Sequence, residues 1–350
     1  MQVIRARNIN DALVKGVELM RTDAVKQASR NGNTLEYPEP VCTVYERPLE
    51  RVLFDKKRDA NPFFHLLESL WMLAGRRDVA WLKRILPRMA EYSDDGVVFN
   101  AAYGYRWRNQ FSLETAGSTS LTDQLSVIVR LLRADYDSRR AVLQIWDAEA
   151  DLGANSKDLA CNTQAMFKIR DGRLNMLVSN RSNDMIWGCY GANAVHFSML
   201  LEYMAACIGV EPGTYRQVSD SFHAYDETWG KVADIDQHYQ GDPYERGEVK
   251  PYPLAAAPEI FDAELLRWLE KPPDAMSLAQ WEEEARVGSW RNPFFIRVAT
   301  PMYQAYFAYK ERKDCDAADQ WLDRCAATDW QRAGQEWLQR RMQVRRGLRP

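Results

Sequence analysis

Apolar residues at helical spacing predict several helices along the chain. In residues 61–75, Phe64 and Trp71 fall two turns apart on one predicted helix face. Asn61 is a favourable N-cap for this helix, and Gly75 is a favourable residue to end it. The same kind of pattern predicts further helices at residues 79–92, 122–133 and 193–208 and from residue 301 onward.

Two segments have the apolar-rich pattern of strands. Residues 141–146 form one short run, and residues 163–180 form two arms around Asp171 and Gly172, a pair that favours a tight hairpin turn. Helices and strands are mixed without regular βαβ alternation, which predicts the α+β class. Proline and charge concentrate between residues 241 and 275, which predicts a loop-rich surface insertion.

The composition is that of a globular protein, with 46% hydrophobic and 27% charged residues among 350. The first 20 residues alternate charged and apolar positions, so we expect neither a signal peptide nor a membrane span. A net charge of -3 argues against general affinity for nucleic acid. The six cysteines have no metal-ligand spacing, which predicts reduced thiols, a cytoplasmic protein and no metal cofactor.

Cys161 is a candidate nucleophile because it lies in a short link before the predicted hairpin, and such loops often carry catalytic groups. Nearby arginines would stabilise its thiolate form. A free cysteine is more often a small buried apolar residue, so the presence of Cys161 alone does not establish a catalytic role. No histidine adjoins it, which disfavours a protease-like Cys-His pair.

Arginines at turns and strand ends are candidate phosphate ligands. They are Arg30 in an early loop, Arg139 and Arg140 before the first predicted strand, and Arg181, which adjoins Ser182. Guanidinium groups beside a hydroxyl suit a phosphate monoester because they donate charge-assisted hydrogen bonds. Solvated surface arginines are the ordinary alternative.

Glu68 falls on or beside the apolar stripe of the helix predicted at residues 61–75. We expect burial there to raise the pKa of its carboxyl group, which would suit a residue that moves protons.

Taken in order, these motifs resemble the thymidylate synthase family, including its phage hydroxymethylase branch. The matching blocks, within residues 29–225, are FFHLLESLWMLAG, YGYRWR, DYDSRR, DLACNT, RDGRLNMLVSNRSND and SFHAY. The order and spacing of DSRR, the cysteine, RSxD and HxY make the resemblance specific. It implies a thymidylate synthase-like α+β fold, with a mixed sheet packed against helices and a homodimer formed through the sheet.

The resemblance also implies a reaction. Cys161 would add to C6 of a pyrimidine nucleoside monophosphate, which makes C5 a nucleophile. The one-carbon unit would come from 5,10-methylenetetrahydrofolate. Glu68 would organise water and move protons at the ring, and Tyr103 would line the base pocket.

Binding roles follow in the same way. Arg181 and Ser182 would hold the 5′-phosphate with Arg30 closing over it, whereas Arg139 and Arg140 would reach the phosphate of the partner subunit.

His223 and Tyr225 would bind the ribose hydroxyl, and Asp184 and Tyr92 would lie against the folate. Asn193 is the candidate for reading the N3/C4 edge of the base, where an asparagine favours uracil over cytosine. Asn193 could instead only cap the following helix.

The sequence departs from the synthase pattern in the direction of the hydroxymethylase branch. Ala160 and Asn162 flank the cysteine where synthases carry proline and histidine, and Tyr92 replaces a shielding tryptophan. The chain ends in an Arg-rich segment instead of a short apolar tail. After the one-carbon unit joins C5, hydride gives a methyl group and water gives a hydroxymethyl group, so a wetter site favours water. We therefore expect a (deoxy)uridylate or (deoxy)cytidylate 5-hydroxymethylase, with thymidylate synthase as the alternative.

We expect a catalytic core over residues 1–240, a loop-rich insertion in the same domain over 241–300, and a helical extension over 301–350. The Arg-rich C-terminus leaves open the alternative that the chain is a non-catalytic relative that binds nucleotides or RNA. Cys161 and Glu68 together argue for catalysis. Hydroxymethylating relatives are typical of phages that modify their DNA, so the expected compartment is a bacterial or phage-infected cytosol.

Overall fold

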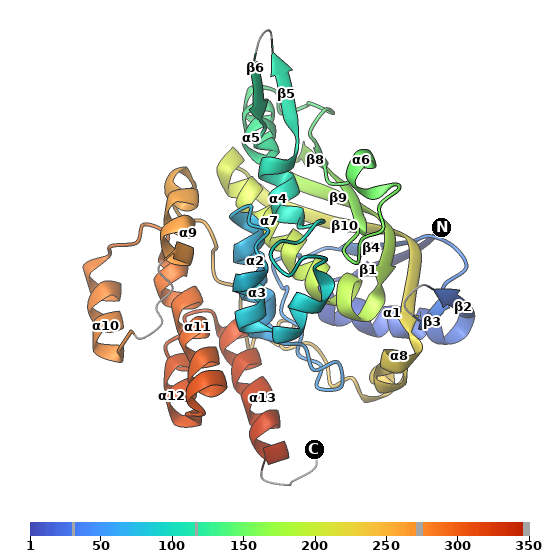
Figure 1. Ribbon diagram of the computed structural model, residues 1–350. Helices are drawn as coiled ribbons and strands as arrows, with labels where there is room; N and C mark the ends of the chain where they lie inside the picture. The colour runs from blue at the N-terminus through green and yellow to red at the C-terminus, as the bar shows by residue number, and fades with distance from the viewer. Residues whose placement is uncertain (30–31, 116–117, 271–275, 346–350) are drawn as a thin grey trace.

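The computed structural model describes residues 1–29, 32–115, 118–270 and 276–345, and Figure 1 shows a β-sheet with helices packed against it. Six strands follow one another across this sheet in the order β1 (Gln2–Ala6), β4 (Val41–Tyr45), β10 (Glu211–Tyr225), β9 (Arg173–Asp184), β8 (Asn162–Arg170) and β7 (Val142–Gln144). β1 is parallel to β4 and β9 is parallel to β10, whereas the other neighbouring pairs are antiparallel. The sheet is therefore mixed, and the α+β prediction is confirmed.

A hairpin of β2 (Val25–Ser29) and β3 (Gly32–Glu36) joins the sheet because β3 pairs with β10. The segment around Arg30 was expected to be a loop, but the strands on both sides of it are paired; Arg30 itself lies outside the described residues. A separate pair of strands, β5 (Ser112–Thr115) and β6 (Ser118–Leu121), projects at the top of Figure 1.

The hairpin of β8 and β9 confirms the strand prediction at residues 163–180. Asp171 and Gly172 have φ angles of 51° and 68°, as a two-residue turn between twisted strands requires. Glycine adopts this backbone region at little cost, and aspartate tolerates it better than most residues do. This turn fixes the register in which Arg170 pairs with Arg173.

One face of the sheet is packed against helices. α7 (Asn193–Ile208) contacts β9 and β10, α1 (Ile9–Asp23) contacts β1 and β4, and α5 (Gln124–Ala134) contacts β7. α7 has the bounds that the sequence predicts, and Gly209 ends it with a φ of 91°. The short helices of the core are α4 (Tyr103–Tyr105), η2 (Arg106–Gln110), α6 (Ala148–Asp151), η3 (Met185–Ala192), α8 (Asp226–Val232) and η4 (Ile235–His238).

α2 (Pro62–Leu73) begins where the sequence predicts, because the Asn61 side chain accepts a hydrogen bond of 3.1 Å from the Phe64 N–H. The single helix predicted at residues 79–92 is wrong. α3 spans only Val79–Ile85, and the 3₁₀ helix η1 (Pro87–Tyr92) follows it. Pro87 has no N–H and its ring clashes with the preceding helical turn, so an α-helix cannot continue through it.

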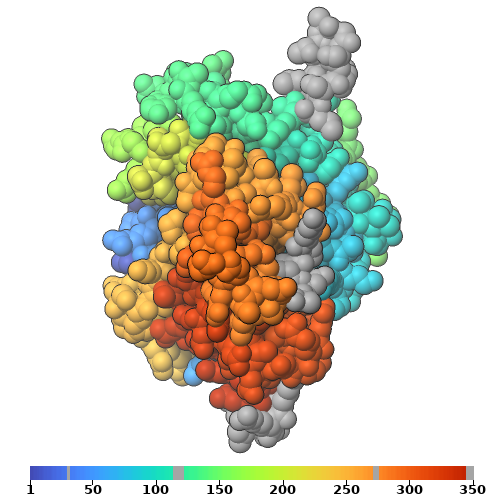
Figure 2. All heavy atoms as spheres, turned by 90° about the vertical axis from the view of Figure 1, so that its left-hand side faces the viewer, coloured from blue at the N-terminus to red at the C-terminus, as the bar shows by residue number. Residues whose placement is uncertain are grey.

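The C-terminal helices gather on one side of the molecule, at the left in Figure 1 and facing the viewer in Figure 2. The loop-rich prediction for residues 241–300 holds only to residue 257. Helices then follow, namely η5 (Pro258–Ile260), α9 (Phe261–Glu270), α10 (Leu278–Val287), η6 (Phe295–Ala299), α11 (Thr300–Phe307), η7 (Ala308–Arg312), α12 (Cys315–Leu322) and α13 (Thr328–Arg345). α11 and α13 contact α2, so this extension shares the core of the sheet domain. Within the described ranges, no helix has the length and apolar character needed to cross a membrane.

Candidate active site

Cys161 immediately precedes β8 and lies beside Arg181 of β9. The Arg181 backbone N–H donates to the Cys161 carbonyl at 3.0 Å, and its Nε donates to the Ala160 carbonyl at 2.8 Å. These bonds hold the guanidinium group so that one terminal nitrogen lies 3.9 Å from the Cys161 sulfur. A fixed positive charge at that position stabilises a thiolate over a thiol. The two candidate residues predicted from sequence are therefore neighbours across the hairpin.

Tyr103 lies against the backbone of the same cysteine. Its hydroxyl oxygen accepts a hydrogen bond of 3.3 Å from the Cys161 N–H. Burial raises the pKa of Tyr103, so the hydroxyl stays neutral. Gly104 permits this placement, because a Cβ there would collide with the Met72 carbonyl of α2. Tyr103 thus supports the nucleophile, and its contact with a base stays a prediction.

A cavity of about 460 Å³ opens next to Cys161. It is lined by β2, β3, the link before β8, and the ends of β9 and β10. The candidate residues Arg181, Ser182, His223 and Tyr225 all lie on its wall. The other lining residues are Ser29, Thr34, Glu36, Lys157, Asp158, Leu159, Cys161 and Ser221.

The parallel register of β9 and β10 explains why these residues meet. Ser182 pairs with Ser221, and Asp184 pairs with His223. His223 Nδ1 lies 3.2 Å from the Ser221 hydroxyl, and the His223 ring meets the edge of Tyr225 with centroids 5.5 Å apart. The result is a polar strip of hydroxyl and imidazole groups with the geometry to hold a sugar or phosphate.

A second and larger cavity, of about 960 Å³, adjoins the first, since Lys157 and Tyr225 line both. Tyr92 and Trp187 lie on its wall with 50% and 43% of their surfaces exposed. Such exposed rings offer stacking surfaces to a planar ligand. Sequence reasoning missed Trp187, although a tryptophan in the RSNDMIW segment is a signal that could have found it.

Asp184 lies at the start of η3. Its Oδ1 accepts from the N–H groups of Ile186 at 2.7 Å and Trp187 at 3.0 Å, so it caps the helix that carries Trp187. Its Oδ2 is buried and has no hydrogen-bond partner among the described residues. Burial also raises the pKa of the Asp184 carboxyl group. A buried polar atom without a partner is unfavourable, so Oδ2 suits a ligand donor or a water molecule.

Glu68 of α2 contacts a residue that sequence reasoning missed. His196 Nε2 of α7 lies 3.0 Å from Glu68 Oε2, with 4% and 13% of the two side chains exposed. Nε2 makes no hydrogen bond among the described residues, so this is a close approach of an imidazole and a carboxylate and not a formed hydrogen bond. Neither residue is among the described residues that line the two cavities. The signal in the sequence was His196 on an otherwise apolar helix, one turn after Asn193.

Asn193 is the first residue of α7 and not its cap. Ala192 holds the cap position, and no side chain caps the helix. The alternative that Asn193 serves only as a cap is therefore wrong. Its amide nitrogen instead donates to Asn183 Oδ1 at 3.1 Å, which turns it toward β9.

Arg139 and Arg140 are exposed and are not among the described residues that line either cavity. Their role in a partner's site stays a prediction.

Three arginines of the described part of the Arg-rich end form internal ion pairs. Arg340 and Arg341 both contact Asp59, at 2.9 and 2.8 Å, and Arg332 contacts Glu336 at 2.8 Å.

Residues 56–251 match the thymidylate synthase family. The chain is 49% identical to a deoxyuridylate hydroxymethyltransferase of Pseudomonas phage M6, over 97% of this chain and 95% of that relative. It is 43% identical to the deoxyuridylate hydroxymethyltransferase of Bacillus phage SP01, over 57% of this chain and 52% of that relative. A putative thymidylate synthase of Methanosarcina acetivorans is 29% identical, over 67% of this chain and 94% of that relative.

Proposed function

The chain belongs to the thymidylate synthase family, and on that premise we propose that it is a deoxyuridylate 5-hydroxymethylase that transfers a one-carbon unit from 5,10-methylenetetrahydrofolate to C5 of dUMP. The observation that carries this proposal is the placement of the Cys161 sulfur 3.9 Å from the Arg181 guanidinium at the wall of a polar cavity. A cysteine activated in this way is a nucleophile that needs no neighbouring histidine.

The first step uses groups of this chain alone. The Cys161 thiolate forms a bond to C6 of the pyrimidine, and the electron pair of the C5–C6 double bond moves onto C5 and the adjacent carbonyl. The Cys161 N–H is already committed to Tyr103, so the sulfur is carried on a backbone that is fixed in place. Arg181, Ser182 and His223 provide the donors that a nucleoside monophosphate requires.

The choice of uracil rests on Asn193 and on the named activity of the relatives. The amide of Asn193 is turned toward Asn183 and β9, beside the strand that carries Arg181 and Ser182. An asparagine amide can both donate to O4 and accept from N3–H of uracil. The two phage relatives at 49% and 43% identity are both described as acting on deoxyuridylate.

The larger cavity is the place where we propose that the folate binds. A bound methylenetetrahydrofolate supplies the one-carbon unit at the oxidation level of formaldehyde. Trp187 and Tyr92 would stack on its ring. Asp184 is not among the described residues that line this cavity, and it would act by capping the helix that carries Trp187. The two cavities share Lys157 and Tyr225, so donor and nucleotide would lie side by side.

Water as the final reactant is supported by the polarity of the site. The Glu68–His196 pair lies outside the described lining of both cavities, and we propose that it takes a proton through an intervening water molecule. Tyr92 is half exposed and so shields the cavity poorly. No described residue after Thr228 lines either cavity, so the described part of the C-terminal extension does not close the site against water.

We also propose that the protein acts as a homodimer through the open face of its sheet, in the cytosol of a phage-infected bacterium. Val142, Met166 and Leu177 form a cross-strand row of partly exposed apolar side chains on the face opposite the buried Ala165 and Val178. An apolar sheet face of this kind is typical of an interface.

The experiment that tests the proposal is tritium release from C5-labelled dUMP in the presence of methylenetetrahydrofolate. Release requires attack at C6 and substitution at C5, so we expect it from the wild type and not from Cys161→Ala. Cys315→Ala, a cysteine on the C-terminal extension, is the matched control and should release tritium like the wild type. Full release by Cys161→Ala would overturn the assignment of the nucleophile.

A further inference from the structure

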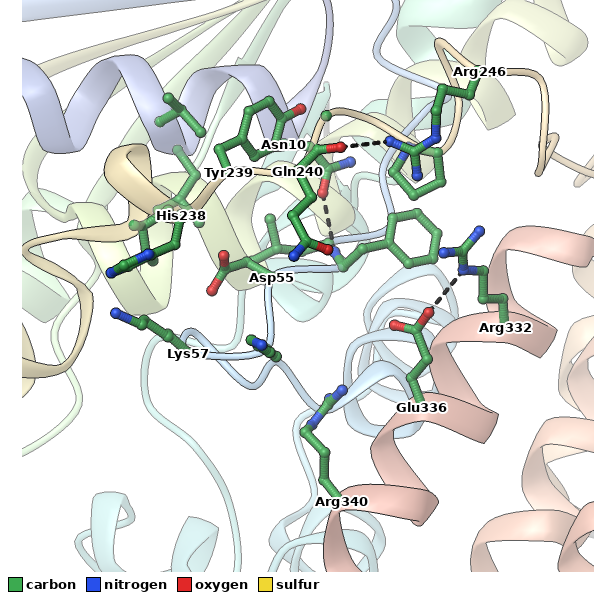
Figure 3. A pocket seen from close by; sticks show the side chains of 18 of the residues that line it. Asn10, Asp55, Lys57, His238, Tyr239, Gln240, Arg246, Arg332, Glu336 and Arg340 are labelled. Atoms are coloured by element: carbon green, nitrogen blue, oxygen red, sulfur yellow. Dashed lines mark hydrogen bonds and ion pairs between the residues drawn. The ribbon is translucent and has the colours of Figure 1, made fainter. Parts of the chain in front are cut away.

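A hollow outside the Cys161 site lies where α13 packs against the core (Figure 3). Its volume of about 330 Å³ is within the range of small-molecule pockets. The wall is built from α1, residues 53–57, residues 235–246 and α13, and it shares no described residue with the two cavities at Cys161. The hollow therefore exists only because the C-terminal extension adds a wall to the core.

The lining of this hollow carries more cationic than acidic side chains, and carboxylates of the described residues beside it pair with all of these cations except Lys56. Five lysine and arginine side chains line it, against the two carboxylates of Asp55 and Glu336. The cationic residues are Lys56, Lys57, Arg246, Arg332 and Arg340. Figure 3 shows Arg332 and Arg340 on one helix, α13, and Arg246 on a separate loop, all around the same space. A concave wall with one excess sign of charge concentrates ligands of the opposite sign.

Most of these cations are held in position by carboxylates at the edge of the hollow. Arg332 contacts Glu336 and Glu248, and Arg340 contacts Asp59. Such contacts fix flexible side chains before a ligand arrives, which lowers the entropic cost of binding. Lys56 is exposed and takes part in no ion pair among the described residues, so its ammonium group can turn to an anion.

The floor of the hollow is apolar and aromatic. Leu13, Leu53 and Ile235 lie beneath it, and Tyr239 presents a ring that is 37% exposed. The Arg332 guanidinium lies 5.6 Å from the centre of the Phe54 ring. The amides of Gln339 and Gln343 add donors and acceptors on the α13 side. An apolar and aromatic surface on which a ring can pack, next to cations and amides, suits a heterocycle that carries phosphates.

We propose that this hollow binds a nucleoside polyphosphate and acts as an effector site, separate from the site of the proposed reaction. Residues 53–59 connect the two regions. Arg340 holds Asp59, and the neighbouring Arg58 donates to the Ile186 carbonyl at 2.7 Å and lies 4.5 Å from the centre of the Trp187 ring. Arg341 also contacts Asp59, at 2.8 Å. A phosphate that draws Arg340 away from Asp59 therefore weakens, but does not remove, the support of the segment that carries Arg58, and through it changes the wall of the larger cavity.

Calorimetric titration of the full-length protein tests the binding, with saturating dUMP present to keep the Cys161 cavity occupied. The probes are ATP, dTTP and inorganic tripolyphosphate. We expect both nucleotides to bind and tripolyphosphate to bind at least about tenfold more weakly, because it lacks the ring. The double variant Lys56→Glu/Gln339→Glu replaces two exposed residues with negative charges and should weaken nucleotide binding at least about tenfold. Lys83→Glu, an exposed residue of α3, is the matched control and should bind like the wild type.

Absence of nucleotide binding, or equal binding by the double variant, overturns the site. Equal affinity for tripolyphosphate overturns the nucleoside assignment. The effector role rests on the proposed function, and it is tested by tritium release from C5-labelled dUMP with and without ATP. A change of at least about twofold in the wild type, lost in the double variant, supports it, and an unchanged rate despite binding overturns it. A protein that binds ATP but releases no tritium would contradict the proposed reaction and leave the binding site intact.

Discussion

His196 Nε2 on α7 lies 3.0 Å from Glu68 Oε2 on α2, and both side chains are almost fully buried. α2 packs on α7, and this contact brings an imidazole and a carboxylate together. A second buried histidine, His65, lies one turn before Glu68 and has a pKa well below its usual range because of burial. His65 therefore stays neutral. The imidazole that contacts Glu68 is that of His196.

We expect His196→Asn to lower kcat about 10- to 1,000-fold and to change the KM for the nucleotide much less, because proton transfer by a positioned group contributes on this scale. A positioning role through Glu68 also predicts that Glu68→Gln/His196→Asn is little worse than Glu68→Gln alone. Steady-state kinetics of the three variants give both numbers. Fully additive losses would show that His196 acts independently of Glu68.

Arg181 supports both the nucleophile and the proposed phosphate site, so its two substitutions should differ. Arg181→Lys keeps a charge but loses the fixed Nε contact with the Ala160 carbonyl. We expect Arg181→Ala to raise the KM for dUMP about 10- to 100-fold, as loss of a charge-assisted hydrogen bond to phosphate would do. We expect Arg181→Lys to recover the KM in part but not kcat. Wild-type kinetics in Arg181→Ala would remove this residue from the site.

The exposed arginines give a test of shared active sites. If Arg139 and Arg140 serve the partner's phosphate site, Arg139→Ala/Arg140→Ala and Cys161→Ala should each be inactive alone. Mixing the two proteins after subunit exchange should restore about a quarter of the wild-type rate, because half of the dimers are mixed and each holds one intact site. Tritium release measures the recovery. Activity that stays absent after exchange, confirmed by mass analysis of the mixed dimer, would contradict the shared site.

Asp329 of α13 provides a pH-dependent stability test. Burial raises its pKa to about 6, although Tyr244 and the Trp330 N–H donate hydrogen bonds to it. A carboxyl group with a raised pKa in the folded state binds protons more tightly there, so stability falls as the pH rises from about 4 to about 6 and stays lower above that. Asp329→Asn should remove this fall and add about 1–3 kcal/mol above pH 6.

Thermal unfolding of the wild type and Asp329→Asn across pH 4–8 measures the difference. The two proteins should converge at the acid end, where Asp329 is protonated in both states. Parallel curves across the whole range would show that Asp329 does not titrate as its burial requires.

Local signals explain which parts of the fold the sequence predicted. The cap at Asn61 and the stop at Gly209 mark α2 and α7, and Asp171-Gly172 marks the hairpin, because each depends only on adjacent residues. Pro87 is an equally local signal, and the prediction of one continuous helix at residues 79–92 ignored it. The strands β3 and β10 were not predicted, because their stability comes from partners distant in sequence.

The site residues also divide into those that local signals bring together and those that meet only through packing of distant segments. Cys161 and Arg181 are 20 positions apart, yet the predicted hairpin makes them neighbours, so their proximity could be anticipated. His196 and Glu68 are 128 positions apart and meet only because α2 packs on α7. Trp187 reaches the larger cavity through the irregular helix η3, which has no periodic pattern of apolar residues. Contacts of this kind depend on packing between elements, which a single sequence does not encode locally.

The most direct test of the account is the identity of the product formed from dUMP and methylenetetrahydrofolate by the wild-type protein, with both products resolved by mass. The polar Glu68–His196 pair and the open wall at Tyr92 lead us to expect 5-hydroxymethyl-dUMP together with tetrahydrofolate. A methylated nucleotide accompanied by dihydrofolate would contradict the account, because it would mean that hydride and not water completes the reaction.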